Sequence, residues 1–181
     1  MKQIKNDRGF TLIELLAVIV VLAIVLLMGA MAVIPRMNDA RKQVFALEAN
    51  QVIQAASTYL MNNALKPGSG KPTYPVKDEV KCVTIDDLIE SGDFDADKDK
   101  YLGRVLIKRL NTTSNIYLYK VSMTNKTVMV VNEGVSGDSN KDITADNVID
   151  YNTTSDDTWS YNSCPTAAEA VTAAWNEKAG S

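Results

Sequence analysis

The chain has 181 residues and a net charge of −3, from 19 basic and 22 acidic side chains, which is room for one domain and an appendage. It contains no histidine and only two cysteines, Cys82 and Cys164. Without histidine the Ser-His and Cys-His nucleophile pairs and the commonest zinc ligand are excluded, and two cysteines are too few for thiolate cages or iron–sulfur clusters. We therefore expect no enzyme, and the modest acidity argues against a general nucleic-acid-binding surface.

An uncharged run of 20 residues, Leu15 to Ile34, follows a short leader that carries Lys2, Lys5 and Arg8. As a helix this run is about 30 Å long, which matches the hydrocarbon core of a bilayer. Because basic residues stay on the cytoplasmic side, we expect the N-terminus inside and everything after Pro35 outside. The sequence therefore predicts a single-pass precursor in the cytoplasmic membrane.

Glu14 is an acidic residue beside the apolar run. A carboxylate placed deep in a membrane costs about 2–3 kcal/mol, so it invites a functional explanation. Alternatively, it lies at the headgroup level near the positive end of the helix dipole, where it costs little. Membrane physics alone leaves both interpretations open.

The segment from Arg8 to Leu16, Arg-Gly-Phe-Thr-Leu-Ile-Glu-Leu-Leu, resembles the processing site of the type IV pilin and pseudopilin family. In that family a prepilin peptidase cuts after the glycine and methylates the new N-terminal residue. The resemblance implies cleavage between Gly9 and Phe10 and a mature chain that begins with N-methyl-Phe10. It also implies that Glu14 is the assembly contact, paired with the N-terminal amine of a neighbouring subunit. Such pairing makes a buried carboxylate tolerable.

The resemblance implies a structural subunit of a type IV pilus or a related pseudopilus, which leaves the membrane for an extracellular, cell-surface filament. Its expected partners are the prepilin peptidase, the assembly platform, and itself or other pilins, and no cofactor is expected. The expected divisions are a leader (1–9), a transmembrane and assembly helix (10–35), an amphipathic helix packed on the head (36–65) and a globular head (66–181). The residues do not separate a major from a minor pilin, or a pilus from a pseudopilus.

Other interpretations remain open. Ala30-Met31-Ala32 has the form of an ordinary signal-peptidase site, and cleavage there would release a secreted binding protein that begins at Val33. Against this, the apolar stretch is longer than the usual h-region of a signal peptide. An uncut, membrane-anchored ectodomain would instead keep Met1. A calcium-binding pseudopilin of a type II secretion or competence system is a further alternative.

The residues after Pro35 change from uniformly apolar to amphipathic, which predicts one long helix from Thr11 to about Asn63, bent near Ile34 by the proline. Apolar residues at three- or four-residue steps are expected to pack on the head: Met37, Ala40, Val44, Leu47, Val52, Ala56, Tyr59 and Leu60. A segment rich in proline and glycine, from Lys66 to Pro72, ends the helix.

The head is predicted to be α+β, with a small antiparallel sheet on the long helix. A short helix follows Thr84 as its cap, with Asp87 at the capping-box position and a terminal glycine, Gly92. A meander of three strands is expected at Tyr101–Leu110, Ile116–Met123 and Thr127–Val131. A second capping box at Thr166 predicts a C-terminal helix that reaches about Lys178 and buries Val171, Ala174 and Trp175.

Cys82 and Cys164 would meet an oxidising setting in an exported head, and we predict that they form a disulfide. By the chain-entropy argument, closing so long a loop stabilises the fold by about 4 kcal/mol. The alternative is a pair of buried or free thiols.

Two acidic clusters resemble calcium loops: Asp93, Asp95, Asp97 and Asp99, and Asp138, Asn140 and Asp142. Neither has the glycine at position six or the glutamate at position twelve of an EF-hand loop. Because some pseudopilins bind calcium in a C-terminal loop, the second cluster remains a Ca²⁺ candidate, with a solvated loop as the default.

Four basic residues of the predicted strands could gather on the sheet: Arg104, Lys108, Arg109 and Lys120. Competence pilins bind DNA, which the resemblance brings to mind. Strand alternation, however, places Arg109 on the face opposite Arg104 and Lys108. We therefore expect a solvated strand surface rather than a nucleic-acid site.

Overall fold

The computed structural model describes residues 11–66, 68, 70–76, 79–110, 116–151, 161–166 and 168–177. The chain forms two compact units, residues 1–40 and residues 41–181, and we call the second the head unit. The predicted α+β class, with a long N-terminal helix and an antiparallel sheet, is confirmed.

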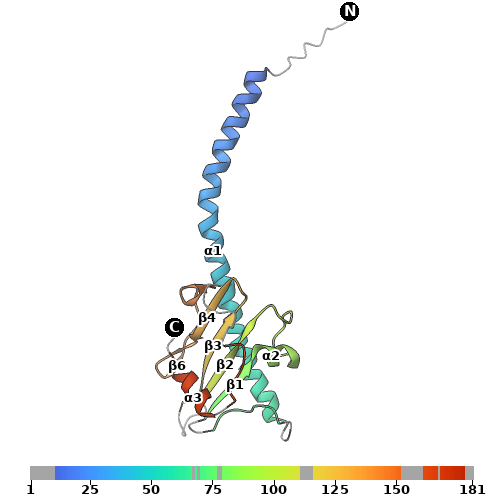
Figure 1. The fold of residues 1–181 in the computed structure, drawn as a ribbon, viewed down its shortest axis with the longest axis vertical. Helices are drawn as coiled ribbons and strands as arrows, with labels where there is room; N and C mark the ends of the chain where they lie inside the picture. The colour runs from blue at the N-terminus through green and yellow to red at the C-terminus, as the bar shows by residue number, and fades with distance from the viewer. Residues whose placement is uncertain are drawn as a thin grey trace, which may run out of the picture. The chain divides into compact units, whose positions relative to one another are not determined.

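The first helix, α1, runs from Leu12 to Ala64 and is drawn in blue to cyan in Figure 1. It is continuous through Pro35, so the proline does not end it. The bend expected there stays a prediction. The helix ends within one residue of the predicted Asn63, before the segment rich in proline and glycine.

The buried face of α1 in the head unit differs from the predicted one. Val44 and Leu47 are 56% and 63% exposed, and Met37 and Ala40, outside that unit, are exposed as well. The residues that α1 buries in the head unit are Phe45, Ala46, Ala49, Val52, Ala55, Ala56, Tyr59, Leu60 and Asn63. The expected stripe is therefore right from Val52 onward and wrong before it, because the helix is apolar on two faces around Val44.

The head unit contains a five-stranded antiparallel sheet with the strand order β1-β2-β3-β4-β7 (Figure 1). The strands are β1 (Val80–Thr84), β2 (Leu102–Arg109), β3 (Tyr117–Thr124), β4 (Val128–Glu133) and β7 (Ile149–Asp150). A small hairpin of β5 (Val135–Ser136) and β6 (Ser139–Asn140) and a 3-10 helix, η1 (Ala145–Asn147), separate β4 from β7.

The predicted three-stranded meander corresponds to β2, β3 and β4. The sheet has two further strands that were not predicted. Strand β1 pairs with β2 along five residues, from Val80 opposite Lys108 to Thr84 opposite Arg104. Strand β7 adds two residues beside β4. Both additions lie at the sheet edges and are short, so their local sequence carries little alternation.

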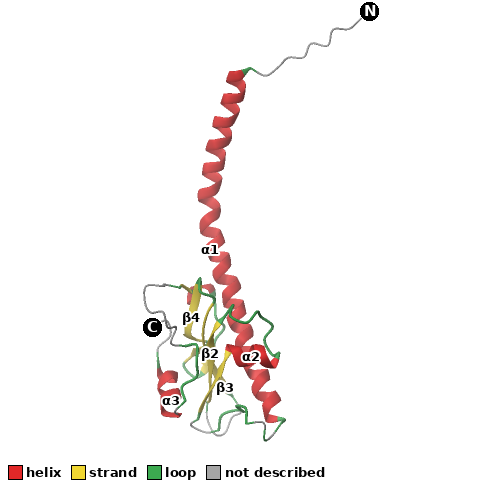
Figure 2. Ribbon diagram, turned by 45° about the vertical axis from the view of Figure 1, so that its right-hand side comes forward, coloured by secondary structure: helices red, strands yellow, loops and turns green. Residues whose placement is uncertain are grey.

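The two faces of the sheet pack against different helices. One face, which includes Val105, Ile107 and Val121, joins the buried side of α1 and helix α2 (Ile85–Ser91) in the main core. The other face, which includes Leu106 and Leu118, packs under helix α3 (Ala168–Asn176). Figure 2 shows α2 beside α1 and α3 apart from both.

The contacts of α3 agree with the predicted C-terminal helix. Among the residues of α3 whose burial is described, Val171, Ala174 and Trp175 are buried, as expected from the 3–4 spacing. Lys178, where the helix was expected to end, lies outside the described residues.

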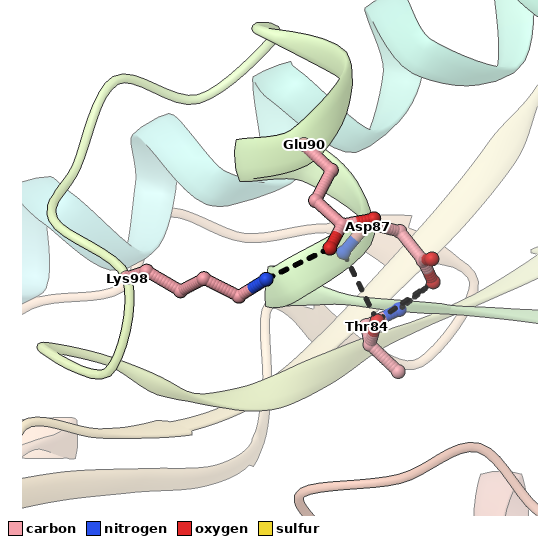
Figure 3. A network of polar contacts seen from close by, with 4 residues as sticks. All are labelled: Thr84, Asp87, Glu90 and Lys98. Carbon is pink, nitrogen blue, oxygen red and sulfur yellow. Dashed lines mark hydrogen bonds and ion pairs between the residues drawn. The ribbon is translucent and has the colours of Figure 1, made fainter.

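Helix α2 has the predicted capping box (Figure 3). The Asp87 N–H donates to Thr84 Oγ1 at 3.1 Å, and the Thr84 N–H and hydroxyl donate to Asp87 Oδ2 at 3.2 and 2.7 Å. Gly92 closes the helix in the left-handed conformation, with φ of 79°. The exposed pair Lys98–Glu90 at 2.9 Å ties the following loop to α2 and adds little in water.

Candidate processing and assembly site

The start of α1 is organised by Thr11 and Glu14. The backbone N–H and the hydroxyl of Thr11 each donate to Glu14 Oε2 at 2.9 Å, and the Glu14 N–H donates to Thr11 Oγ1 at 3.3 Å. This is the reciprocal pattern of a capping box, the same as that of Thr84 and Asp87 in α2. It satisfies N–H groups that a helix start leaves without partners, and it holds the carboxylate at the positive end of the helix.

Beyond Glu14 the helix carries no charge from Leu15 to Ile34, and its side chains are exposed from Leu15 to Ala30. The mean hydropathy of its most apolar window is 3.1, and of the described helices α1 is the one long and apolar enough to cross a membrane. Exposure of so many apolar side chains to water is unfavourable, so this part of α1 is expected to lie in lipid or against other apolar surfaces. Glu14 thus lies between the polar N-terminal residues and the apolar part of α1.

Gly9 and Phe10 lie outside the described residues, and what bears on them is the sequence around them. Residues 4–30 match the prokaryotic N-terminal methylation motif. The chain carries the class III signal peptide of type IV pilins and pseudopilins. No curated protein and no solved structure is significantly similar to the chain.

The methylation motif spans 27 residues, from 4 to 30, and so covers Gly9, Phe10, Thr11 and Glu14. It supports a type IV pilin-like precursor that is processed by prepilin peptidase. Together, this signal and the apolar part of α1 fit a membrane-anchored precursor. The head unit lies outside the matched range.

Sequence reasoning assigned no role to Thr11, although its signal was readable. Threonine followed three residues later by glutamate, just before an apolar run, is the sequence pattern of a capping box. The same pattern was recognised at Thr84. The processing motif gave roles to Gly9, Phe10 and Glu14, but none to Thr11.

The structure joins Cys82 and Cys164 in a disulfide, the pairing that the sequence predicted. Their Cα atoms are 5.7 Å apart, and 82 positions separate them along the chain. Cys82 lies on the edge strand β1, and Cys164 lies four residues before α3. The bond therefore ties the segment that carries α3 to the first strand of the sheet.

The calcium candidates are not brought together as ligands. The Asn140 side chain instead pairs with β3, where its Oδ1 accepts from the Tyr119 N–H at 3.0 Å and its Nδ2 donates to the Tyr117 carbonyl at 2.8 Å. Asp138 lies in the turn between β5 and β6, and Asp142 lies after β6. Among the residues that the structure describes, no group of three acidic, cysteine or histidine side chains could hold a metal ion.

The expectation of a solvated basic strand surface was wrong for Arg104. This side chain is only 6% exposed, donates from Nη1 to the Ser163 carbonyl at 2.9 Å and lies over the Tyr161 ring at 5.0 Å. Burial lowers the pKa of its guanidinium. Lys108 and Lys120 are half-buried on the same face of the sheet, beside Trp175. The C-terminal segment covers this face, which strand alternation alone does not reveal.

Proposed function

We propose that this protein is a structural subunit of a type IV pilus or a related pseudopilus. The precursor is held in the cytoplasmic membrane by the apolar part of α1, cut between Gly9 and Phe10 by prepilin peptidase, and methylated on Phe10. The apolar helix then exchanges lipid for the helices of other subunits as the chain enters a helical filament. The observation that carries the proposal is the match of residues 4–30 to the methylation motif, together with the uncharged run of α1 that follows Glu14 and is exposed from Leu15 to Ala30.

Glu14 is proposed as the assembly contact. Both bonds from Thr11 go to Oε2, so Oε1 accepts no hydrogen bond from any residue that the structure describes. An arriving ammonium group, such as the N-terminal amine of a neighbouring Phe10, fits this free oxygen by charge. Opposite charges that meet in an apolar, low-dielectric setting attract strongly, and an unpaired carboxylate there is costly. Such pairing would favour one stagger between successive helices over others.

The partners proposed on this basis are the prepilin peptidase, the assembly platform, and copies of this chain or of sister pilins. The mature protein would lie in a filament outside the cell, with the head unit on the filament surface. The work of the protein is then mechanical, and no catalytic residue is assigned to it.

Mass spectrometry of the N-terminus of the protein from its native membranes and extracellular fraction tests this proposal. We expect a mature chain that begins with N-methyl-Phe10. A chain that begins at Val33 would mean release by ordinary signal peptidase as a secreted protein. A chain that keeps Met1 or Lys2 would mean an uncut ectodomain. Either of these two results overturns the proposal.

A further inference from the structure

A pocket of about 240 Å³ opens on the face of the sheet that α3 covers. Lys108 on β2 and Lys120 on β3 line it, with Trp175 of α3 on one side. The ammonium nitrogens of the two lysines lie 5.8 and 5.1 Å from the centre of the Trp175 ring. Two strands and a helix from distant parts of the sequence therefore build one site.

The two lysines bring positive charge to the pocket, and the carboxylates of Glu133 and Glu177 act on Lys120 without forming an ion pair with it. No ion pair joins either of them to a residue that the structure describes. Lys120 donates to the backbone carbonyls of Trp175 and Glu177 at 2.6 and 3.1 Å, so its position is fixed. Lys108 has its cation–π contact with Trp175, and its ammonium group keeps hydrogen-bond donors to offer.

The remaining lining residues add aliphatic surface to a pocket that is otherwise polar. Leu110, Leu118 and Val135 contribute aliphatic surface, and Leu118 is buried. One acidic residue, Asp138, is present and exposed, which opposes ligands with several negative charges. The volume is below the usual range of about 300–1,000 Å³ for drug-sized ligands, so the occupant is small.

We propose that this pocket binds a small monocarboxylate with an apolar body, whose carboxylate pairs with Lys108 and whose body packs on Leu118 and Trp175. A carboxylate complements the positive charge of Lys108, and charge-assisted hydrogen bonds are about twice as strong as neutral ones. A multiply charged or heavily hydroxylated ligand fits less well, because of Asp138 and the aliphatic lining. The site lies in the head unit and uses no residue of α1 or of the methylation motif.

Binding of benzoate to the full chain in detergent micelles tests the proposal. Trp159 is replaced by Phe, so that Trp175 is the one tryptophan left and its indole N–H resonance reports on the pocket. Benzamide, which has the same shape without the charge, and acetate, which has the charge without the ring, are titrated in parallel. We expect a saturable shift with benzoate and affinities lower by about tenfold or more for both comparison compounds.

Variants of Lys108 give the second arm. Lys108→Met keeps the aliphatic stem and should weaken benzoate binding by about tenfold or more, whereas Lys108→Arg keeps the charge and should retain it. Lys66→Met makes the same charge change at an exposed position near the end of α1, outside the pocket, and should leave binding unchanged.

Three results would each overturn the proposal: no saturable shift with benzoate, equal affinity for benzamide or acetate, or unaltered binding in Lys108→Met. None of them bears on the filament function, which is tested by the N-terminus of the mature chain.

Discussion

Asn50 on α1 and Ile143, in the segment that follows β6, exchange two hydrogen bonds. Asn50 Nδ2 donates to the Ile143 carbonyl at 2.9 Å, and the Ile143 N–H donates to Asn50 Oδ1 at 3.0 Å. Ile143 is buried in the main core, and both bonds are partly shielded from water. One side-chain amide thus holds the backbone of Ile143, a buried residue whose neighbours Asp142 and Thr144 are exposed.

We predict that Asn50→Ala lowers the free energy of unfolding by about 1–3 kcal/mol, because it leaves the buried N–H and carbonyl of Ile143 without partners. Gln51→Ala, at the exposed next position of the same helix, is the matched control and should change little. Urea denaturation of the full chain in micelles measures both. Equal stability of the two variants would show that the hydrogen bonds of Asn50 to Ile143 do not stabilise the fold.

Reduction of the Cys82–Cys164 disulfide should destabilise the head unit by about 4 kcal/mol, because the 82-position separation closes a long loop in the unfolded chain. We also expect faster hydrogen exchange in α3, which the bond tethers to β1. The double variant Cys82→Ser, Cys164→Ser should match the reduced protein and should not respond to dithiothreitol. A reduced protein as stable as the oxidised one would rule out this contribution.

Gly103→Ala should be among the most damaging single changes. Gly103 has φ of 154°, and a Cβ there would lie 2.7 Å from Met123 Cα and overlap the Ser122 carbonyl oxygen on β3. We expect a loss of at least about 3 kcal/mol in unfolding free energy. Gly92 also has a positive φ, 79°, but a Cβ added there has no neighbour within 4 Å. Gly92→Ala should therefore lower the unfolding free energy by only about 1–2 kcal/mol. If both variants lose a similar amount of unfolding free energy, the overlap of the new Cβ with β3 is not what destabilises Gly103→Ala.

The filament proposal predicts that assembly depends on the negative charge of Glu14 and not on its hydrogen bonds to Thr11. Glu14→Gln keeps an oxygen that accepts from Thr11 but removes the charge, and we expect normal processing with filaments lost or strongly reduced. Thr11→Ala removes one of the two bonds to Oε2 but keeps the charge, and filaments should persist. Glu14→Ala should behave as Glu14→Gln does. Electron microscopy of sheared filaments and the mass of the N-terminus measure both steps, and normal filaments from Glu14→Gln would contradict charge pairing.

Stability should fall at alkaline pH because of buried tyrosines. Burial raises the pKa of Tyr119, so the folded protein keeps a proton that the unfolded chain loses near pH 10. The associated stability is complete below about pH 10 and is lost as the pH rises through the raised pKa. Burial lowers the pKa of Lys120, which acts in the opposite direction. Tyr119→Phe should therefore flatten the decline, and an unchanged profile between about pH 9 and 11 would contradict this origin.

Features set by neighbouring residues were predictable from the sequence. The capping box of α2 involves Thr84 and Asp87, three positions apart, and the three strands β2 to β4 follow one another with short connections. Their hydrogen bonds are determined by local chemistry and by alternation. The methylation motif is also local, so the sequence alone is enough to single out Glu14.

Features set by distant residues were not predictable. The face of α1 near Phe45 was assigned wrongly, because apolar side chains at Val44 and Leu47 satisfy the same helical spacing. Arg104 was expected in solvent, but Ser163 and Tyr161, more than 50 positions away, cover it. The residue pattern of β2 gives no indication that a C-terminal segment covers this strand. The same cause hid the pocket between Lys108 and Trp175.

The position at which α1 begins has a practical consequence for maturation. Its first helical residue is Leu12, and the Thr11–Glu14 bonds that start it lie wholly beyond the Gly9–Phe10 bond. Cleavage at the proposed site would therefore leave each of these bonds, and every described residue of α1, in place. If prepilin peptidase cuts at Gly9–Phe10 as we propose, the residues that form this helix start are the same in the precursor and in the mature chain.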